Sequence, residues 1–250
     1  MKKSISLVLF GVLAILIVSG CTQPTVKPTP VPTVQPTVVP TVKLSAGNYL
    51  VDSKGLTLYM FARDVAGDSK CTGGCVDIWH VFYQENITVS PDLNASDFGT
   101  ITRTDGKEQT TYKGWPLYYY SQDVNPGDTK GEGIINAWFV ARPYTVFLAD
   151  KDNLTYLVDG KGNTLYTFAR DTPGVSNCTG ACLNIWHVFY TENIVAPSLL
   201  NTSDFGNIAN SVGSEQTTYK QMPLYYYTND TKRGDTNGQG FNNAWVVAAP

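Results

Sequence analysis

The ten residues GLTLYMFARD, at positions 55–64, carry the pattern on which the fold depends. They contain the spacing Tyr-x-aromatic-x-x-Asp, which occurs four times in the chain. The twelve residues of these four copies are Tyr59, Phe61, Asp64, Tyr118, Tyr120, Asp123, Tyr166, Phe168, Asp171, Tyr225, Tyr227 and Asp230. Residues two apart on a strand share a face. The aspartate follows where the strand ends, and we expect it to accept hydrogen bonds from turn N–H groups.

A functional alternative for these motifs is a tyrosine platform for ligand contact or electron hopping. The structural role is the one that the pattern favours, because strand and turn residues of these types occur in many folds. The same ambiguity applies to all four copies.

The last 200 residues of the chain are one sequence written twice, at a constant offset of 107 residues. Cys71 corresponds to Cys178, and Trp79-His80 corresponds to Trp186-His187. A period of about 100 residues fits a whole small domain rather than a solenoid unit. The sequence therefore predicts two tandem copies of one module, so any site proposed in one copy is tested against the other.

Each module is expected to be mostly β. In the first module, segments rich in β-branched and aromatic residues alternate with Gly-containing turns. The expected strands are residues 48–52, 56–61, 108–112, 115–120 and 137–141. Residues 76–83 are compatible with a short helix or with a strand, since periodicity cannot decide over so few residues. The predicted fold is two homologous β-rich modules, each with one short helix.

The N-terminus has the features of an export signal. Lys2 and Lys3 precede an apolar run over residues 5–18, which ends in small residues before Cys21. Residues 18–21 resemble a lipobox, in which the cysteine becomes the lipidated first residue. The alternative is an uncleaved anchor helix, although the run is shorter than the roughly 20 residues that a membrane-spanning helix prefers.

These signals divide the chain. Residues 1–20 are the predicted lipoprotein signal peptide, and residues 21–43 are the lipidated cysteine with a Thr/Pro-rich stalk. Proline favours extended polyproline II structure in such a stalk. Residues 44–143 form module 1, residues 144–150 a short linker, and residues 151–250 module 2.

The predicted location is outside the cytoplasm, at the cell surface or in a periplasm, on a membrane. The net charge is −3, and no run of basic residues follows Lys3, which argues against a nucleic-acid partner. The predicted partners are the membrane, through the lipid anchor, and an unidentified envelope or extracellular ligand.

Beyond Cys21, four cysteines form two local pairs, Cys71 with Cys75 and Cys178 with Cys182. An even number of cysteines in an exported protein favours disulfides, and four cysteines allow three connectivities. Because each module is expected to fold alone, we favour the two local pairs. No cofactor is expected.

A metal site or a redox-active dithiol are the alternatives for these cysteines. His80 and His187 each lie five residues after a cysteine pair, and such a set offers three soft or borderline ligands. No fourth ligand is apparent, and the Cys-x-x-Cys-His motif of c-type haem attachment is absent. The alternative is that each histidine has no ligand role and is a partly buried side chain beside a tryptophan.

No catalytic constellation stands out. Asp97-Phe98-Gly99 spells a kinase triplet, but the accompanying kinase motifs are absent. The glycine-rich residues 127–133 precede a strand rather than a helix, so no helix N-terminus is expected there to bind phosphate. We therefore expect a protein that is not an enzyme.

Together, the lipobox, the Tyr-x-aromatic-x-x-Asp copies, the spacing of Cys71, Cys75 and Trp79, and the segment 109–118 resemble the family called secreted repeat of unknown function. The resemblance covers residues 48–143 and 155–250, as two tandem copies. It implies an exported, lipid-anchored, repeat-built protein with no established activity. Family members usually have proline where this chain has His80 and His187, and Gln221-Met222 departs from the Gly-x-Pro pattern of the family.

The sequence therefore predicts a lipid-anchored surface protein with a non-catalytic binding or envelope role. The alternative function is an extracytoplasmic redox or metal-handling lipoprotein that uses the cysteines and histidines.

Overall fold

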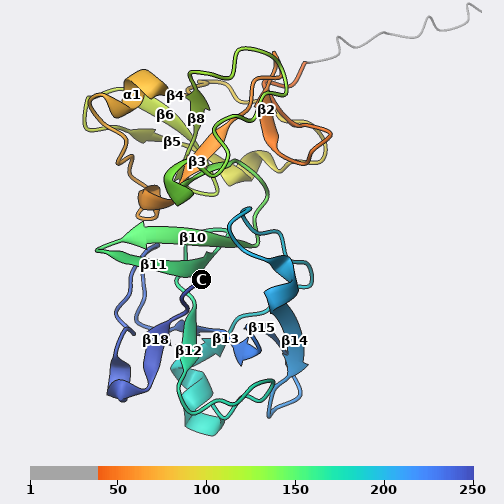
Figure 1. Cartoon of the computed structure of the whole chain (residues 1–250), viewed down its shortest axis with the longest axis vertical. Helices are drawn as coiled ribbons and strands as arrows, with labels where there is room; N and C mark the ends of the chain where they lie inside the picture. The colour runs from red at the N-terminus through yellow and green to blue at the C-terminus, as the bar shows by residue number, and fades with distance from the viewer. Residues whose placement is uncertain (1–38) are drawn as a thin grey trace, which may run out of the picture. The chain divides into compact units, whose positions relative to one another are not determined.

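The computed structural model describes residues 39–250, and residues 38–250 form one compact unit. The predicted signal peptide, the lipidation at Cys21 and most of the predicted stalk lie outside the described residues. The described residues are mostly β, in small antiparallel sheets repeated in the two modules, as predicted (Figure 1). No helix in this part of the chain has the length and apolarity needed to cross a membrane.

Short strands dominate the first module, with one α-helix and three 3₁₀ helices. The strands are β1 (Val42–Leu44), β2 (Leu50–Asp52), β3 (Tyr59–Phe61), β4 (Trp79–Val81), β5 (Phe98–Thr102), β6 (Glu108–Tyr112), β7 (Trp115–Pro116), β8 (Tyr118–Tyr120) and β9 (Trp138–Val140). The helices are η1 (Ala62–Asp64), α1 (Cys75–Ile78), η2 (Ala95–Asp97) and η3 (Ile134–Asn136). Residues 76–83 are thus divided between a helix and a strand.

Module 2 repeats the order of the strands. Its strands are β10 (Val146–Lys151), β11 (Leu154–Asp159), β12 (Tyr166–Phe168), β13 (Trp186–Val188), β14 (Phe205–Ala209), β15 (Glu215–Tyr219), β16 (Met222–Pro223), β17 (Tyr225–Tyr227) and β18 (Trp245–Val247). Its 3₁₀ helices are η4 (Gly180–Asn184), η5 (Thr202–Asp204) and η6 (Phe241–Asn243). Where module 1 has helix α1, module 2 has the 3₁₀ helix η4.

Strand order reveals an internal symmetry in each module. The central sheet of module 1 has the order β4-β8-β3-β9, and Tyr59 pairs with Tyr118 at its middle. Trp79 pairs with Tyr120 on one side, as Trp138 pairs with Phe61 on the other. Module 2 has the equivalent order, β13-β17-β12-β18. Each half of a module therefore donates its last strand to the Tyr-containing strand of the other half.

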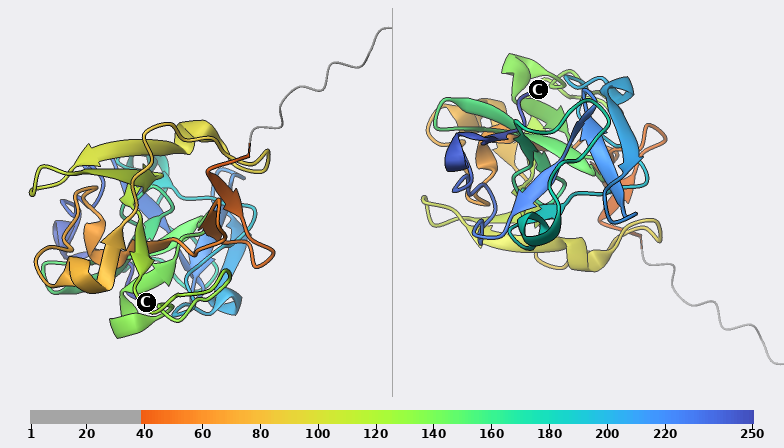
Figure 2. Two further views of the ribbon diagram at one scale, coloured as in Figure 1. Left: turned by 90° about the horizontal axis from the view of Figure 1, so that it is seen from above. Right: turned by 90° about the horizontal axis from the view of Figure 1, so that it is seen from below.

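Two further sheets complete module 1. The three-stranded sheet β5-β6-β7 lies along one side, and the β1-β2 ribbon lies on an adjoining side (Figure 2). Val42 is fully buried, and Thr41 donates its backbone N–H to Thr88 O. The predicted end of the stalk at residue 43 therefore falls inside β1, and the predicted linker 144–150 is mostly strand β10.

The two modules pack on one another through β10. Phe147 of β10 contacts the ring of Trp115 at 4.8 Å between centroids, and Trp115 Nε1 donates to Gly160 O at 3.1 Å. Arg63 and Asp150 form a 2.7 Å ion pair across the same junction. The buried residues of both modules consequently form one continuous core.

Arg233 of module 2 explains why the two copies differ at residues 114–115. Its guanidinium lies 4.7 Å from the Trp115 ring and donates to Val65 O and Lys113 O. A Cβ on Gly114 would overlap Arg233 Nη1, so a side chain there would displace the guanidinium. In module 2 the equivalent residue is Gln221, which also has a positive φ of 67°. The turn therefore accepts another residue, and the close approach of Arg233 favours glycine in module 1.

Candidate functional site

The four Tyr-x-aromatic-x-x-Asp motifs are joined in reciprocal pairs. Tyr59 donates its hydroxyl to Asp123 and Tyr118 donates to Asp64, each at 2.6 Å. In module 2, Tyr166 bonds Asp230 at 2.6 Å and Tyr225 bonds Asp171 at 2.8 Å. Each tyrosine thus bonds the aspartate of the other motif in its module. The motif residues therefore lock the two halves of each module together.

The second oxygen of each aspartate accepts a backbone N–H from the following turn, contributed by Lys70, Lys130, Asn177 and Asn237. Asp64 is fully buried, whereas Asp123 is half-buried. Burial disfavours the charged carboxylate and raises the pKa of Asp64 to about 7. Burial likewise raises the pKa values of Tyr59 and Tyr118. Asp64, Tyr59 and Tyr118 thus lie in the buried centre of module 1.

An aromatic stack crosses the central sheet of module 1. The ring centroids are 4.1 Å apart for Phe61 and Trp138, 3.8 Å for Trp138 and Trp79, and 4.5 Å for Trp79 and Tyr120. Both faces of each tryptophan are therefore covered, and only ring edges remain free. Gly131 allows this arrangement, because a Cβ there would lie 2.7 Å from the Trp79 ring. Module 2 contains the same stack of four rings.

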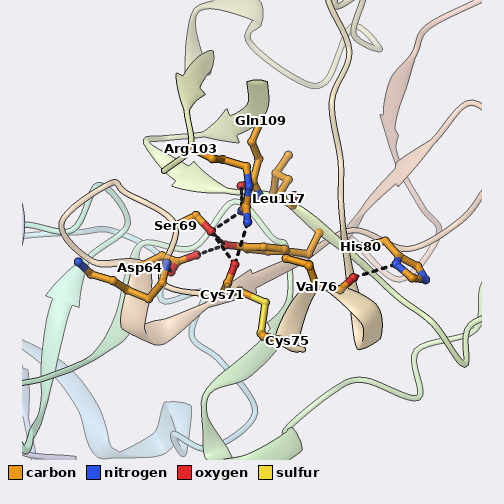
Figure 3. The surroundings of a disulfide bond; sticks show 11 residues. Asp64, Ser69, Cys71, Cys75, Val76, His80, Arg103, Gln109 and Leu117 are labelled. Atoms are coloured by element: carbon orange, nitrogen blue, oxygen red, sulfur yellow. Dashed lines mark hydrogen bonds between the residues drawn. A yellow bond between two sulfur atoms is a disulfide. The ribbon is translucent and has the colours of Figure 1, made fainter. Parts of the chain in front are cut away.

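The predicted disulfides are present as local pairs, Cys71–Cys75 and Cys178–Cys182. Arg103 is buried beside the first one and donates Nη2 to Cys71 O at 2.8 Å and Nη1 to Gln109 at 2.6 Å (Figure 3). In module 2 the equivalent of Arg103 is Asn210. The disulfides fix the turn that leads into the Trp-containing strand.

The histidines stand apart from the cysteines. His80 is exposed, and its Nδ1 lies 3.0 Å from Val76 O, pointing away from the disulfide (Figure 3). His187 is likewise exposed on the equivalent strand. Among residues 39–250, no three His, Cys, Asp or Glu side chains are grouped closely enough to hold a metal ion. The Cys/His set is thus not assembled as a ligand set in this structure.

A cavity of about 620 Å³ lies against the aromatic stack of module 1. Its lining includes the two tryptophans Trp79 and Trp138 and the apolar residues Cys75, Ile78, Ile134 and Ile135. Arg63 and Lys70 also line it, each in an ion pair with an aspartate. Small-molecule sites commonly have volumes of about 300–1,000 Å³ and mostly apolar walls. The cavity therefore has the size and chemistry of a ligand site.

Module 2 fills the corresponding position with its own side chain. Phe241 takes the place of Ile134, and its ring lies 5.8 Å from that of Trp186 and 5.6 Å from that of Tyr227. The contact with Trp186 is edge-to-face, at an interplanar angle of 67°. This geometry is favourable because a ring edge is the positive side of the aromatic quadrupole and a ring face is the negative side.

Ile135, which also lines the cavity, has an unfavourable backbone conformation. It has φ 49° and ψ 24°, a left-handed conformation that β-branched residues avoid, and it is 65% exposed. In module 2 the equivalent residue is Asn242, a type that adopts this conformation more readily. Strained residues concentrate at functional sites, where the strain has a purpose other than stability.

The sequence alone does not reveal the cavity, but the spacing of its two tryptophans indicates that they are related. Trp79 and Trp138 are 59 residues apart, the same spacing as Tyr59 and Tyr118. This shared spacing indicates that the two tryptophans are equivalent residues of two half-modules. Their stacking follows from the symmetric pairing of the half-modules.

Comparison with known families is consistent with this half-module organisation. A family model described as a secreted repeat of unknown function matches residues 40–83, 99–142, 149–190 and 206–249, together more than half of the chain. The expected number of family copies was two, whereas the family unit is the half-module and occurs four times. No curated protein and no solved structure matches the chain.

Proposed function

The chain belongs to the family of secreted repeats of unknown function, and from this premise we propose that it is a lipid-anchored surface protein that binds an aromatic ligand in module 1. The chain is an extracellular repeat protein with two disulfides, which fit that location. The anchor would be the lipid on Cys21, and the Thr/Pro-rich segment after it would separate the modules from the membrane. The proposed role is binding without catalysis.

The observation that carries the proposal is the exchange of Phe241 for Ile134. In module 2 an aromatic ring of the chain itself rests against the aromatic stack. In module 1 the same position has a smaller aliphatic residue beside a cavity of about 620 Å³. Module 2 therefore provides an internal example of how the ring of a ligand would contact the stack of module 1.

The chemistry of the cavity defines the ligand class. Because both faces of Trp79 and Trp138 are covered, a ligand meets their edges, which attract the negative face of another ring. Ile78 and Ile135 are 50% and 65% exposed and would be covered by an apolar ligand. Arg63 and Lys70 also line the cavity, but they form ion pairs with Asp150 and Asp68. The ligand class is an aromatic or conjugated ring system.

Two fluorescent probes test binding with a soluble fragment of residues 38–250, which form one compact unit. Anilinonaphthalene sulfonate has the expected ring system, and N-phenylnaphthylamine has similar rings without the sulfonate. We expect saturable binding of both, because the rings make the contact with the stack. The variant Ile134→Phe is expected to abolish it by supplying the ring that module 2 already has.

Phe241→Ile is the matched control, because it makes the reverse exchange in module 2. It is expected to retain the module 1 site and to add probe binding. Equal binding by the wild-type fragment and by Ile134→Phe, with both folded by circular dichroism, would contradict the proposal. If the probes bind as expected, competition by unlabelled aromatic acids would narrow the ligand class.

The anchoring part of the proposal has its own test. Cys21→Ser in the full chain removes the residue that would carry the lipid. We expect the wild-type chain to be released from membranes by detergent and its N-terminal peptide to carry a lipid mass. Detection of an unprocessed N-terminus beginning at Met1 would instead support the uncleaved anchor helix.

A further inference from the structure

A second cavity, of about 640 Å³, lies at the junction of the two modules. Most of its lining comes from module 2, and Lys113 comes from module 1. A smaller cavity of about 400 Å³ lies between β5 and Lys161. Both cavities are lined by Lys113 and Lys161, so these two lysines stand between them. A single module could not form this site.

The positive charges at the junction are not neutralised by ion pairs. Among residues 39–250, the four ion pairs involve other cations, so Lys113 and Lys161 have no acidic partner. Arg233 lies next to them, and its Nη1 donates to the backbone carbonyl of Lys113 at 3.1 Å. Lys113 and Lys161, which come from different modules, thus line the same two cavities without an ion-pair partner. Such ammonium groups can bind an anionic ligand.

The two carboxylates of the larger cavity are already engaged within the protein. Asp159 accepts hydrogen bonds from the backbone N–H of Lys161 and from the hydroxyl of Tyr226. Asp230 accepts the hydroxyl of Tyr166. Asp97 lines only the smaller cavity. The lysines thus remain available to a carboxylate brought by a ligand.

The rest of the lining suits a hydroxylated ligand. His187, Asn163 and Thr228 provide uncharged hydrogen-bonding groups, and Tyr190 is 43% exposed. A sugar ring presents hydroxyls at its edge and C–H groups on its faces, which match polar side chains and an aromatic ring. We propose that the module junction binds an acidic oligosaccharide, with its carboxylates at Lys113 and Lys161. This site is independent of the aromatic-ligand site proposed above.

The duplication supplies matched controls for the two lysines. Lys220 corresponds to Lys113, with φ 48° against 49°, and each ammonium lies over a preceding tyrosine ring. Lys54 corresponds to Lys161. Lys54 and Lys220 do not line the junction cavity. Each control lysine thus has the local sequence position of its counterpart without the site.

Calorimetric titration of residues 38–250 with trigalacturonic acid tests the proposal, with maltotriose as the neutral comparison. We expect saturable binding of the acid and none of maltotriose at the same concentrations. Lys113→Ala and Lys161→Ala are each expected to weaken binding roughly tenfold, as loss of a charged hydrogen bond does. Lys54→Ala, Lys220→Ala and Ile134→Phe are expected to leave it unchanged.

Three results would overturn the inference. Equal binding of maltotriose would show that charge is not recognised. Equal losses in the control variants would show that the interaction is a general effect of positive charge. Displacement of the trisaccharide by inorganic phosphate at matching concentrations would identify a simple anion site rather than a sugar site.

Discussion

Removing the Tyr118 hydroxyl, with the substitution Tyr118→Phe, tests the reciprocal pairing of the half-modules. Tyr118 and Asp64 are both fully buried, and the hydroxyl donates to the carboxylate at 2.6 Å. Phenylalanine keeps the ring and removes the hydroxyl, which also forms a 2.7 Å hydrogen bond with Ser69 Oγ. In the equivalent pair, Tyr59 with Asp123, the aspartate is more exposed than Asp64. Tyr59→Phe is therefore the matched, milder change.

The magnitude follows from the charge of the acceptor. A neutral hydrogen bond contributes about 1 kcal/mol, and one to a charged group contributes about 2–3 kcal/mol. Burial raises the pKa of Asp64 to about 7, above its ordinary 3.8. The stability contributed by this group is therefore complete below about pH 4 and is lost as the pH rises through 7. Loss of the Tyr118 hydroxyl raises the pKa of Asp64 further, so the variant loses additional stability above pH 7.

Urea unfolding of residues 38–250 at pH 5 and pH 8 measures this prediction. We expect Tyr118→Phe to lower the free energy of unfolding by about 1 kcal/mol at pH 5 and by about 2–3 kcal/mol at pH 8. Tyr59→Phe is expected to cost less at pH 8. Equal losses of stability for the two variants, or a loss for Tyr118→Phe that is the same at both pH values, would show that the Tyr118 hydroxyl does not stabilise a charged Asp64.

Three further changes have expected outcomes. Ile135→Asn should raise the melting temperature, because it relieves a left-handed conformation that costs about 1 kcal/mol, and should weaken probe binding in the same sample. Replacing Cys71 and Cys75 with serine should cost only about 2 kcal/mol, because the closed loop is short; the loss in urea unfolding should equal that for Cys178 and Cys182. Arg233→Ala should lower stability by about 3 kcal/mol, because it removes two charged hydrogen bonds to module 1; scanning calorimetry should then show two transitions in place of one.

Local chemistry in the sequence predicted several features of the fold. The β-branched and aromatic segments 108–112 and 115–120 contain strands, and the two cysteine pairs are disulfides. Residues 56–58, by contrast, belong to no strand, since Leu58 bonds Leu50 and Ala141 outside the central ladder. Patterns within a few residues are thus informative, because they report local propensity.

The features that depend on distant pairing were not predictable. The four motifs could be recognised in the sequence, but their hydrogen-bond partners could not. Tyr59 bonds Asp123 and Tyr118 bonds Asp64, because the two half-modules, which are 59 residues apart, exchange strands. The exchange of Ile134 for Phe241 is a modest change in the sequence, and only the packing shows that one leaves a cavity beside the stack while the other contacts it. Arg233 stands where module 1 has Pro126, with no signal that it crosses into the other module.

The stoichiometry of binding distinguishes a cavity in module 1 alone from one in each module. Calorimetric titration of residues 38–250 with anilinonaphthalene sulfonate counts the sites that accept an aromatic ligand. We predict one site per chain, none in Ile134→Phe and two in Phe241→Ile. Two sites in the wild-type chain, or one site that persists in folded Ile134→Phe, would contradict it.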